Sequence, residues 1–364
     1  MKSVAVIIAG GKGERFWPKS RSHLPKQFLP IIDGGKTMIQ VTALRLLPLA
    51  SYDDIFIVTN KEYVGLIKEQ LPQIPQENIL AEPRACGTAP CIAFAAAVIN
   101  RKYEDAVMMV LPADHFIKLE EIYINTMRQA VETAEKYGSL VTIGITPTYP
   151  ETGYGYINFD KDAGFDKNTG ESPGVVYTVK RFVEKPDIDK AKEYLASGRY
   201  LWNSGMFVWK LSTILAKFES LLPDIYKGAM DIKNAFGTEE YTKVLEKTFA
   251  EFKPQSIDYG IMERSDHIYT IPGSFGWDDV GNWLALERIN KANDNGNIVQ
   301  GDAITIDTKD SIIFGGKKLI AIVGLEDIVV VDTDDALLIC AKDATQDVKK
   351  VVDSLKSCNR NELI

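Results

Sequence analysis

The sequence predicts an α/β fold, a Rossmann-like doubly wound mixed sheet followed by a small, β-rich C-terminal domain. Up to about residue 145, short β-branched runs alternate with segments whose apolar residues recur every three or four positions. Such runs are typical of strands that helices bury on both faces. After residue 290 the composition changes to short strands separated by turns. We therefore expect two domains, residues 1–288 and 289–364.

The first half supplies the elements of the sheet in order. We expect strands at residues 4–9, 54–60, 106–114 and 140–145. We expect helices at residues 37–49, 89–101 and 124–138. Ligands of such sheets bind at the carboxyl ends of the strands, so the segments that follow these strands are candidates for a site.

The middle section, about residues 146–285, is less regular and richer in Gly, Tyr and Trp. A helical stretch runs from Leu211 to Phe252. Aromatic rings mixed with small polar groups suit the apolar faces and hydroxyls of a sugar, although a twisted sheet with aromatic packing explains any one motif equally well. The motifs are TGYGYINF (152–159), VKRFVEKP (179–186), YLWNSGMFVWK (200–210) and SFGWDDVGNW (274–283).

In the C-terminal section, the residue pattern predicts short strands from residue 296 to 341 and then an amphipathic helix, ATQDVKKVVDSLKS. Apolar residues recur about every six positions in places, as from Ile298 to Ile304 and from Ile306 to Ile312. This spacing hints at one or two coils of a β-helix. A small apolar β domain is equally compatible with a dimer contact.

Composition narrows the class of protein. The 364 residues carry a net charge of −8, which argues against a general nucleic-acid binder. No apolar stretch reaches membrane-spanning length, so we expect a cytoplasmic protein without membrane contact. The four cysteines show neither C-x-x-C spacing nor a matching histidine cluster, which indicates reduced structural thiols.

The turn after the first strand predicts a polyphosphate site. Gly10, Gly11 and Gly13 allow backbone amides to approach phosphate oxygens. A Walker loop is excluded because Glu14-Arg15 follow Gly13, and prolines interrupt the helix that a dinucleotide fingerprint requires. A glycine hairpin with solvated charges is the alternative, but a local basic excess in an acidic chain favours an anionic ligand. The basic residues are Lys12, Arg15, Lys19, Arg21 and Lys26.

Two carboxylates are candidates for a metal site. Asp114 ends the strand-like run AVMMVLPAD, where an acidic residue serves either as a turn or helix cap or as a Mg²⁺ ligand. A second ligand is then expected from Asp278-Asp279, of which Asp279 is the better candidate and Asp278 stays open. Substrate phosphates would complete the coordination of Mg²⁺.

Together these motifs resemble the sugar-phosphate nucleotidylyltransferases, in particular the mannose-1-phosphate guanylyltransferases (GDP-mannose pyrophosphorylases). The resemblance covers essentially the whole chain, and RFWPKSRSHLPKQFL is its most specific part. It implies the nucleotide-diphospho-sugar transferase fold with a short left-handed β-helix used in dimerisation. The matching segments, in chain order, are AGGKGERFWPKSR, PKQFLP, AEPRACGTAP, LPADH, TGYGYI, RFVEKP, WNSGMF and WDDVGNW.

The resemblance also implies roles for individual residues, with Arg15, Lys26 and Asp114 in catalysis and Asp114 with Asp279 holding the metal. The nucleotide would be bound by Ala9, Gly10, Gly11, Gly13, Glu82, Pro83, Gly87 and Thr88. The sugar phosphate would be bound by Gly155, Glu184, Lys185 and Asn203.

The implied reaction converts GTP and α-D-mannose 1-phosphate into GDP-mannose and diphosphate, with Mg²⁺ as cofactor and a homodimer as the assembly. Related bifunctional enzymes add an isomerase domain, and since this sequence ends before one we expect a monofunctional enzyme. Two alternatives stay open. One is a nucleotidylyltransferase for another nucleotide or sugar, and the other is a non-catalytic sugar-nucleotide-binding regulatory homologue.

Overall fold

The computed structural model describes residues 1–32, 34–162, 164 and 176–364, which divide into two compact units. Unit 1 comprises Met1–Gly10, Ala43–Pro112 and Leu119–Trp277, and unit 2 comprises Gly11–Thr42, Ala113–Lys118 and Asp278–Ile364. The boundary after residue 288 stays a prediction. Within the described ranges, no helix is both long and apolar enough to cross a membrane.

Unit 1 is built on a nine-stranded mixed sheet with the order β3-β2-β1-β4-β9-β6-β10-β8-β7. The first four strands in this order are parallel, and β9 runs antiparallel to both β4 and β6. The strands are β1 (Ser3–Ile8), β2 (Ile55–Asn60), β3 (Ile79–Glu82), β4 (Val107–Pro112), β6 (Leu140–Ile145), β7 (Tyr156–Phe159), β8 (Tyr177–Val183), β9 (Tyr200–Lys210) and β10 (Ile268–Gly273).

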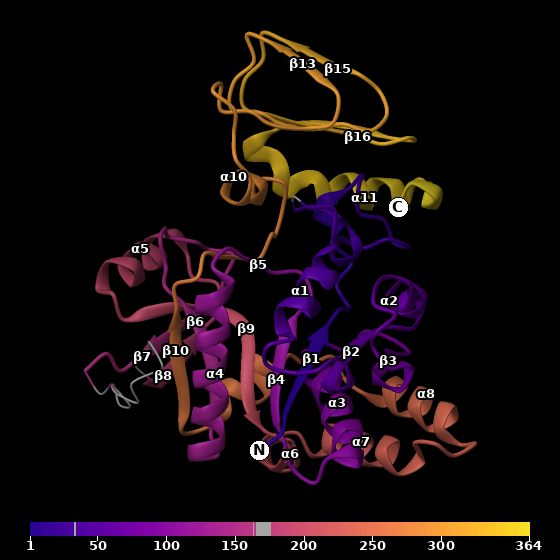
Figure 1. Ribbon diagram of the computed structural model, residues 1–364, viewed down its shortest axis with the longest axis vertical. Helices are drawn as coiled ribbons and strands as arrows, with labels where there is room; N and C mark the ends of the chain where they lie inside the picture. The colour runs from indigo at the N-terminus through magenta and orange to yellow at the C-terminus, as the bar shows by residue number, and fades with distance from the viewer. Residues whose placement is uncertain (33, 163, 165–175) are drawn as a thin grey trace. The chain divides into compact units, whose positions relative to one another are not determined.

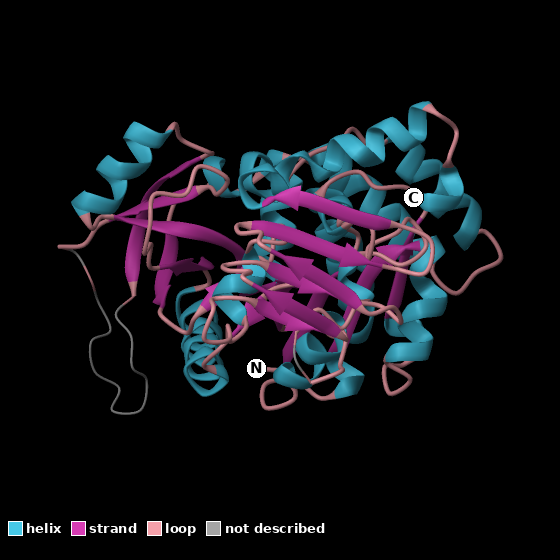
Figure 2. Cartoon of the chain, turned by 90° about the horizontal axis from the view of Figure 1, so that it is seen from above, coloured by secondary structure: helices cyan, strands magenta, loops and turns pink. Residues whose placement is uncertain are grey.

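Helices pack around the large sheet of unit 1, as Figure 1 and Figure 2 show, and helices alternate with the strands from β1 to β4. Along β1 and β4, Val4, Val6, Met108 and Val110 belong to the same buried cluster as the apolar residues of α3. The intervening residues of these strands are also buried, so helices cover both faces. The helices are α1 (Met38–Leu46), α2 (Val64–Gln70), α3 (Thr88–Lys102), α4 (Glu120–Tyr137), α5 (Ile188–Ser197), α6 (Leu211–Leu221), α7 (Pro223–Ala235), α8 (Tyr241–Glu251) and α9 (Ile257–Gly260).

The predicted α/β class is confirmed, and two details differ from the expectation. The helical stretch expected over 211–252 is three helices, because Leu222-Pro223 and the turn after Ala235 interrupt it. The long strand β9 comes from the middle section and inserts between β4 and β6. The place of β9 in the sheet was not predicted from the sequence, because that place depends on long-range pairing.

Unit 2 contains the predicted β-helix. Its coils stack in parallel, so that Ile298 pairs with Ile312 and Ile312 with Val329, while Ala303 pairs with Ile320. The last strand closes the stack in the antiparallel sense. The strands are β12 (Ile298–Gln300), β13 (Ala303–Ile306), β14 (Ile312–Phe314), β15 (Ile320–Val323), β16 (Ile328–Asp332) and β17 (Leu337–Ala341).

The segment after β1 shares a hydrophobic core with this β-helix. Phe16 and Trp17 pack in one buried cluster with Trp283, Val348 and Val352. Unit 2 also contains α10 (Ala285–Ile289) and the terminal helix α11 (Val348–Ser357), and the short strands β5 (Phe116–Ile117) and β11 (Trp277–Asp278) lie at its chain boundaries. The predicted phosphate loop is therefore fixed by C-terminal residues.

Candidate active site

A polar pocket of about 380 Å³ lies entirely within unit 2. It brings together Arg15, Lys26, Asp114 and Asp279, the four residues expected to act in catalysis or metal binding. It also includes Lys349 of α11, which sequence reasoning missed because nothing in the terminal helix suggests a ligand. The lining residues are Lys12, Gly13, Glu14, Arg15, Phe16, Lys26, Asp114, His115, Asp279, Gly281 and Lys349.

The glycine loop is shaped by close contact with the Lys26 segment. Gly13 has a φ of +62°, and a Cβ there would lie 2.4 Å from the Cβ of Lys26. The Gln27 side chain donates to the carbonyl of Gly11 at 2.9 Å, and the Ser20 hydroxyl donates to the carbonyl of Lys12 at 3.0 Å. These bonds fix the loop conformation around the pocket.

Lys26 is the most enclosed cation of the pocket, with 6% of its surface exposed. Its Nζ lies 2.6 Å from Oδ2 of Asp114 and donates to the carbonyls of Asp279 at 3.0 Å and Val280 at 2.9 Å. Burial alone would raise the pKa of Asp114, but the charges of Lys26 and His115 outweigh it and lower that pKa. Asp114 is therefore an anion fixed beside a fixed cation.

The two aspartates of the WDDVG motif have different environments. Asp278 is buried, and its carboxylate accepts bonds from Arg288 and from the backbone N–H of Val280. Val280 has a φ of +49°, an unfavourable conformation for a β-branched residue. Asp279 lines the pocket and Asp278 does not. Asp278 thus secures the turn that presents Asp279.

The pocket residues are suitable for a Mg²⁺ ion whose remaining coordination positions would be filled by substrate oxygens. Asp114 and Asp279 both line the pocket, and carboxylate oxygens are the hard ligands that Mg²⁺ takes. Among the residues that the structure describes, no group of three or more His, Cys, Asp or Glu side chains is arranged to hold a metal. A Mg²⁺ ion here would consequently need phosphate oxygens for much of its coordination.

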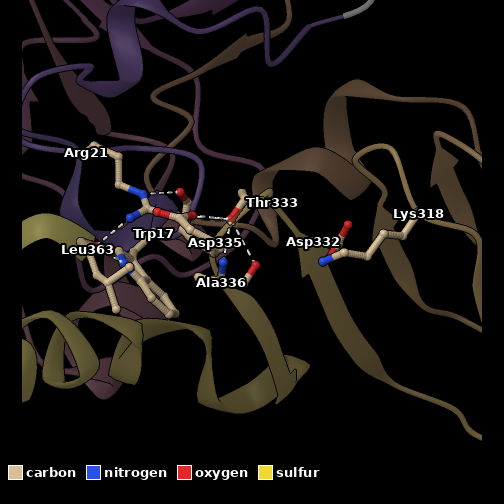
Figure 3. A network of polar contacts seen from close by, with 9 residues as sticks. Trp17, Arg21, Lys318, Asp332, Thr333, Asp335, Ala336 and Leu363 are labelled. Carbon is tan, nitrogen blue, oxygen red and sulfur yellow. Dashed lines mark hydrogen bonds and ion pairs between the residues drawn. The ribbon is translucent and has the colours of Figure 1, made fainter.

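Arg21 and Lys19 do not line this pocket, although both belong to the basic segment. The Arg21 guanidinium donates to Asp335 at 2.6 Å, to the carbonyl of Leu363 at 2.8 Å and to the Thr333 hydroxyl at 3.4 Å (Figure 3). Trp17 donates to the same Leu363 carbonyl at 2.7 Å. Arg21 therefore joins the loop to the C-terminal region instead of adding charge to the pocket.

The expected base-binding residues lie in unit 1, at the end of β3 and the start of α3. Gly87 has a φ of +85°, and a Cβ there would lie 2.4 Å from the carbonyl oxygen of Gln255. That carbonyl accepts from the N–H of Ala89 at 3.1 Å, and the Thr88 hydroxyl accepts from the N–H of Ile257 at 2.8 Å. The loop before α3 is thus held by residues 255–257, while Pro83 stays partly exposed.

Glu82 is unusual because its carboxyl group is buried and, among the described residues, no nearby charge or hydrogen bond offsets the cost of that burial. Only 5% of its surface is exposed, and burial raises its pKa to about 8. Within the described part of the chain, Oε1 of Glu82 and Oδ1 of the paired Asn60 are buried without a hydrogen-bond partner. Glu82 and Asn60 are the last residues of β3 and β2, at the edge of the sheet where Ala9 and Gly10 follow β1. Buried acceptors without donors suit a ligand that supplies N–H groups.

The expected sugar-binding residues also lie in unit 1. The backbone N–H of Asn203 donates to the carbonyl of Gly155 at 2.8 Å, and a Cβ on Gly155 would lie 2.8 Å from Oε1 of Glu184. Lys185 follows Glu184 and has a φ of +34°, a backbone conformation that residues other than glycine rarely adopt. Gly155, Glu184 and Asn203 are thus brought together.

Asp258 joins this group and was missed by sequence reasoning. Its Oδ1 accepts from the Asn203 side-chain amide at 2.7 Å. Burial and then the charge of Asp258 raise the pKa of Glu184, and burial raises that of Asp258. Neighbouring carboxylates and an amide are strong acceptors and donors for sugar hydroxyls. No motif surrounds Asp258, so only the tertiary structure identifies it.

Comparisons with known proteins find matches for both parts of the chain. The family model described as "Nucleotidyl transferase" matches residues 4–296, and the one described as "MannoseP isomerase/GMP-like beta-helix domain" matches residues 301–355. A "Mannose-1-phosphate guanylyltransferase" of Salmonella muenchen is 40% identical over 99% of this chain and 75% of its own length. The "Xanthan biosynthesis protein XanB" of Xanthomonas campestris is 41% identical over 98% of this chain and 74% of its own length.

A solved structure shares the whole architecture. The Thermus thermophilus protein described as "mannose-1-phosphate geranyltransferase" superposes with a TM-score of 0.86 at 32% identity. The match covers 98% of this chain and 100% of that one.

Proposed function

Because the chain belongs to the nucleotidyl transferase family, we propose that it transfers GMP from GTP to α-D-mannose 1-phosphate, giving GDP-mannose and diphosphate. The observation that carries the proposal is the unit 2 pocket, in which Lys26 and Asp114 form an ion pair beside Arg15, Asp279 and the glycine loop. Such a pocket supplies both the cations and the metal ligands that phosphoryl chemistry requires.

The chemistry needs charge stabilisation and no nucleophilic side chain. An oxygen of the sugar phosphate attacks the α-phosphorus in line with the departing diphosphate, and that oxygen is already anionic at neutral pH. The remaining barrier comes from repulsion between the two anions and from charge that develops on the leaving group. Lys26 would neutralise the α-phosphate, and Arg15 with the amides of the glycine loop would hold the rest of the triphosphate.

Asp114 and Asp279 would hold Mg²⁺, which supplies Lewis-acid stabilisation of phosphoryl oxygens. Lys26 fixes the orientation of Asp114 through the 2.6 Å contact and thereby fixes one ligand direction. Asp278 and the strained Val280 fix the other by holding the turn at Asp279. The chain therefore prepares both carboxylates before substrate arrives.

Selectivity would come from unit 1. Glu82 and the Gly87–Thr88 loop would meet guanine, whose N1–H and N2–H₂ groups are donors that adenine lacks on the same edge. Glu184, Asn203 and Asp258 would accept and donate bonds to mannose hydroxyls, while Lys185 would bind the sugar phosphate. These assignments rest on the resemblance and on the clustering described above.

We also propose that the β-helix associates with a second copy of the chain. Leu337 and Ile339 on β17 are 56% and 61% exposed. They border an apolar hollow of about 370 Å³ formed by β15, β16 and β17. In the described chain β17 pairs only with β16, so its outer edge is available for an antiparallel copy of itself.

Light scattering after gel filtration tests this assembly. The double variant Leu337→Lys and Ile339→Lys should elute as a monomer, while Leu119→Lys, at a leucine of unit 1 that is 45% exposed, should keep the dimer mass. A monomeric wild-type protein at micromolar concentration would contradict the proposal.

The activity is tested by measuring diphosphate release from GTP, ATP, UTP and dTTP with mannose 1-phosphate or glucose 1-phosphate, with and without Mg²⁺. We expect release with GTP and mannose 1-phosphate that requires the metal. Faster turnover of another pair would assign a different nucleotidylyltransferase. Tight GDP-mannose binding without turnover would instead indicate a regulatory homologue.

A further inference from the structure

The C-terminal helix α11 reaches the same pocket as the glycine loop. Lys349, in its first turn, lines the pocket with Lys12, Arg15, Lys26 and Asp279, all within unit 2. Figure 1 shows this helix in yellow beneath the coils of the β-helix. A cation more than 300 positions from the glycine loop thus faces the proposed triphosphate site.

The orientation of α11 is fixed by packing and by a second lysine. Val348 and Val352 are each 2% exposed and share a core with Phe16 and Trp17. Lys356 forms an ion pair with Glu14 of the loop at 2.7 Å. Lys349 precedes Lys356 by two helical turns, so both lysines lie on the same side of α11. The helix cannot rotate Lys349 away without breaking these contacts.

The charges of the pocket indicate where Lys349 acts. Asp114 is paired with the buried Lys26, and Glu14 is paired with Lys356. Within the described residues, Lys349 has no ion-pair partner, whereas its neighbour Lys350 pairs with Asp347 at 2.9 Å. Lys12, Arg15 and Lys349 are thus exposed cations at the outer part of the pocket, and Lys26 is the enclosed one.

We propose that Lys349 binds the β- and γ-phosphates of the nucleotide, the part that leaves as diphosphate. The inference rests on the proposed function and adds a residue to it. Lys26 serves the α-phosphate, and the diphosphate end carries the most negative charge as the bond to the α-phosphorus breaks. A flexible, exposed lysine at the rim can follow the leaving group as it departs. The C-terminal region then contributes directly to substrate binding.

The reverse reaction uses GDP-mannose and diphosphate as two separate substrates, so the KM for each can be measured independently. Lys349→Met keeps the apolar stem and removes the charge, and Lys350→Met is the matched control one position along the same helix. We expect Lys349→Met to raise the KM for diphosphate about 10- to 100-fold, as for loss of a charge-assisted bond, with the KM for GDP-mannose within about twofold. Lys349→Arg should recover most of the loss.

Equal KM values for diphosphate in the Lys349→Met and Lys350→Met proteins would overturn the inference. Calorimetric titration of inorganic diphosphate into each protein with Mg²⁺ gives a readout that does not depend on turnover. Absence of turnover by the wild-type protein in both directions would refute the proposed function. Weaker diphosphate binding by Lys349→Met alone would still support the role of Lys349.

Discussion

The buried carboxyl of Glu82 predicts that folding stability depends on pH in a specific direction. Burial raises its pKa from 4.5 to about 8, a shift equivalent to about 5 kcal/mol at 1.36 kcal/mol per unit. Below pH 4.5 the folded and unfolded states are both protonated, and no penalty exists. As the pH rises towards 8 the unfolded chain ionises while the folded carboxyl stays neutral, so the free energy of unfolding falls.

Glu82→Gln removes this titration while keeping the shape of the side chain. We expect the free energy of unfolding of the variant, relative to wild type, to rise by about 3 kcal/mol between pH 5 and pH 8. Urea unfolding followed by tryptophan fluorescence at pH 5, 6.5 and 8 measures the difference. Glu69→Gln, at an exposed glutamate of α2, should show no such trend.

Parallel pH profiles for Glu82→Gln and wild type would refute the reasoning, since they would show that Glu82 ionises without a burial penalty. The same carboxyl gives a functional readout. If guanine N–H groups bind it, GTP binding favours the ionised form and releases up to about one proton near pH 7. Calorimetry of GTP binding in buffers of different ionisation enthalpy measures that proton, and Glu82→Gln should abolish it.

Three further predictions concern the pocket of unit 2. Lys26→Ala should lower turnover by about two to three orders of magnitude, because an enclosed cation beside the reacting phosphate is lost; near-normal steady-state kcat would remove Lys26 from the site. Asp114→Asn should raise the Mg²⁺ concentration for half-maximal activity by about 10- to 100-fold with unchanged circular dichroism, and an unchanged metal titration would contradict the assignment. Gly13→Ala should lower turnover by about 100-fold, since the added Cβ would lie 2.4 Å from Lys26 Cβ and displace it. Gly65→Ala on α2, which has open space for a Cβ, is its control and should retain wild-type rates.

The sequence by itself predicted the α/β class and several residues that line the pocket of unit 2, among them Gly13, Lys26 and Asp114. Buried strands such as β1 and β4 are continuous apolar runs, and the residues that follow them must lie at one edge of the sheet. Gly13 and Asp114 were predicted in this way, whereas Lys26 was predicted from the basic segment and from the family resemblance. The β-helix was indicated only weakly, because its repeat is set by the pairing of whole coils, as between Ile298 and Ile312.

Only the tertiary structure decided which charges face the pocket. Arg21 and Lys26 look alike in sequence, yet Asp335 and the carbonyl of Leu363 hold Arg21 elsewhere while Asp114 holds Lys26 in place. Asp278 and Asp279 are adjacent, yet Asp278 is buried and bonded to Arg288, whereas Asp279 lines the pocket. Lys349 lines the pocket because α11 packs on Phe16 and Trp17. Each outcome depends on partners far away in the chain, which local spacing does not encode.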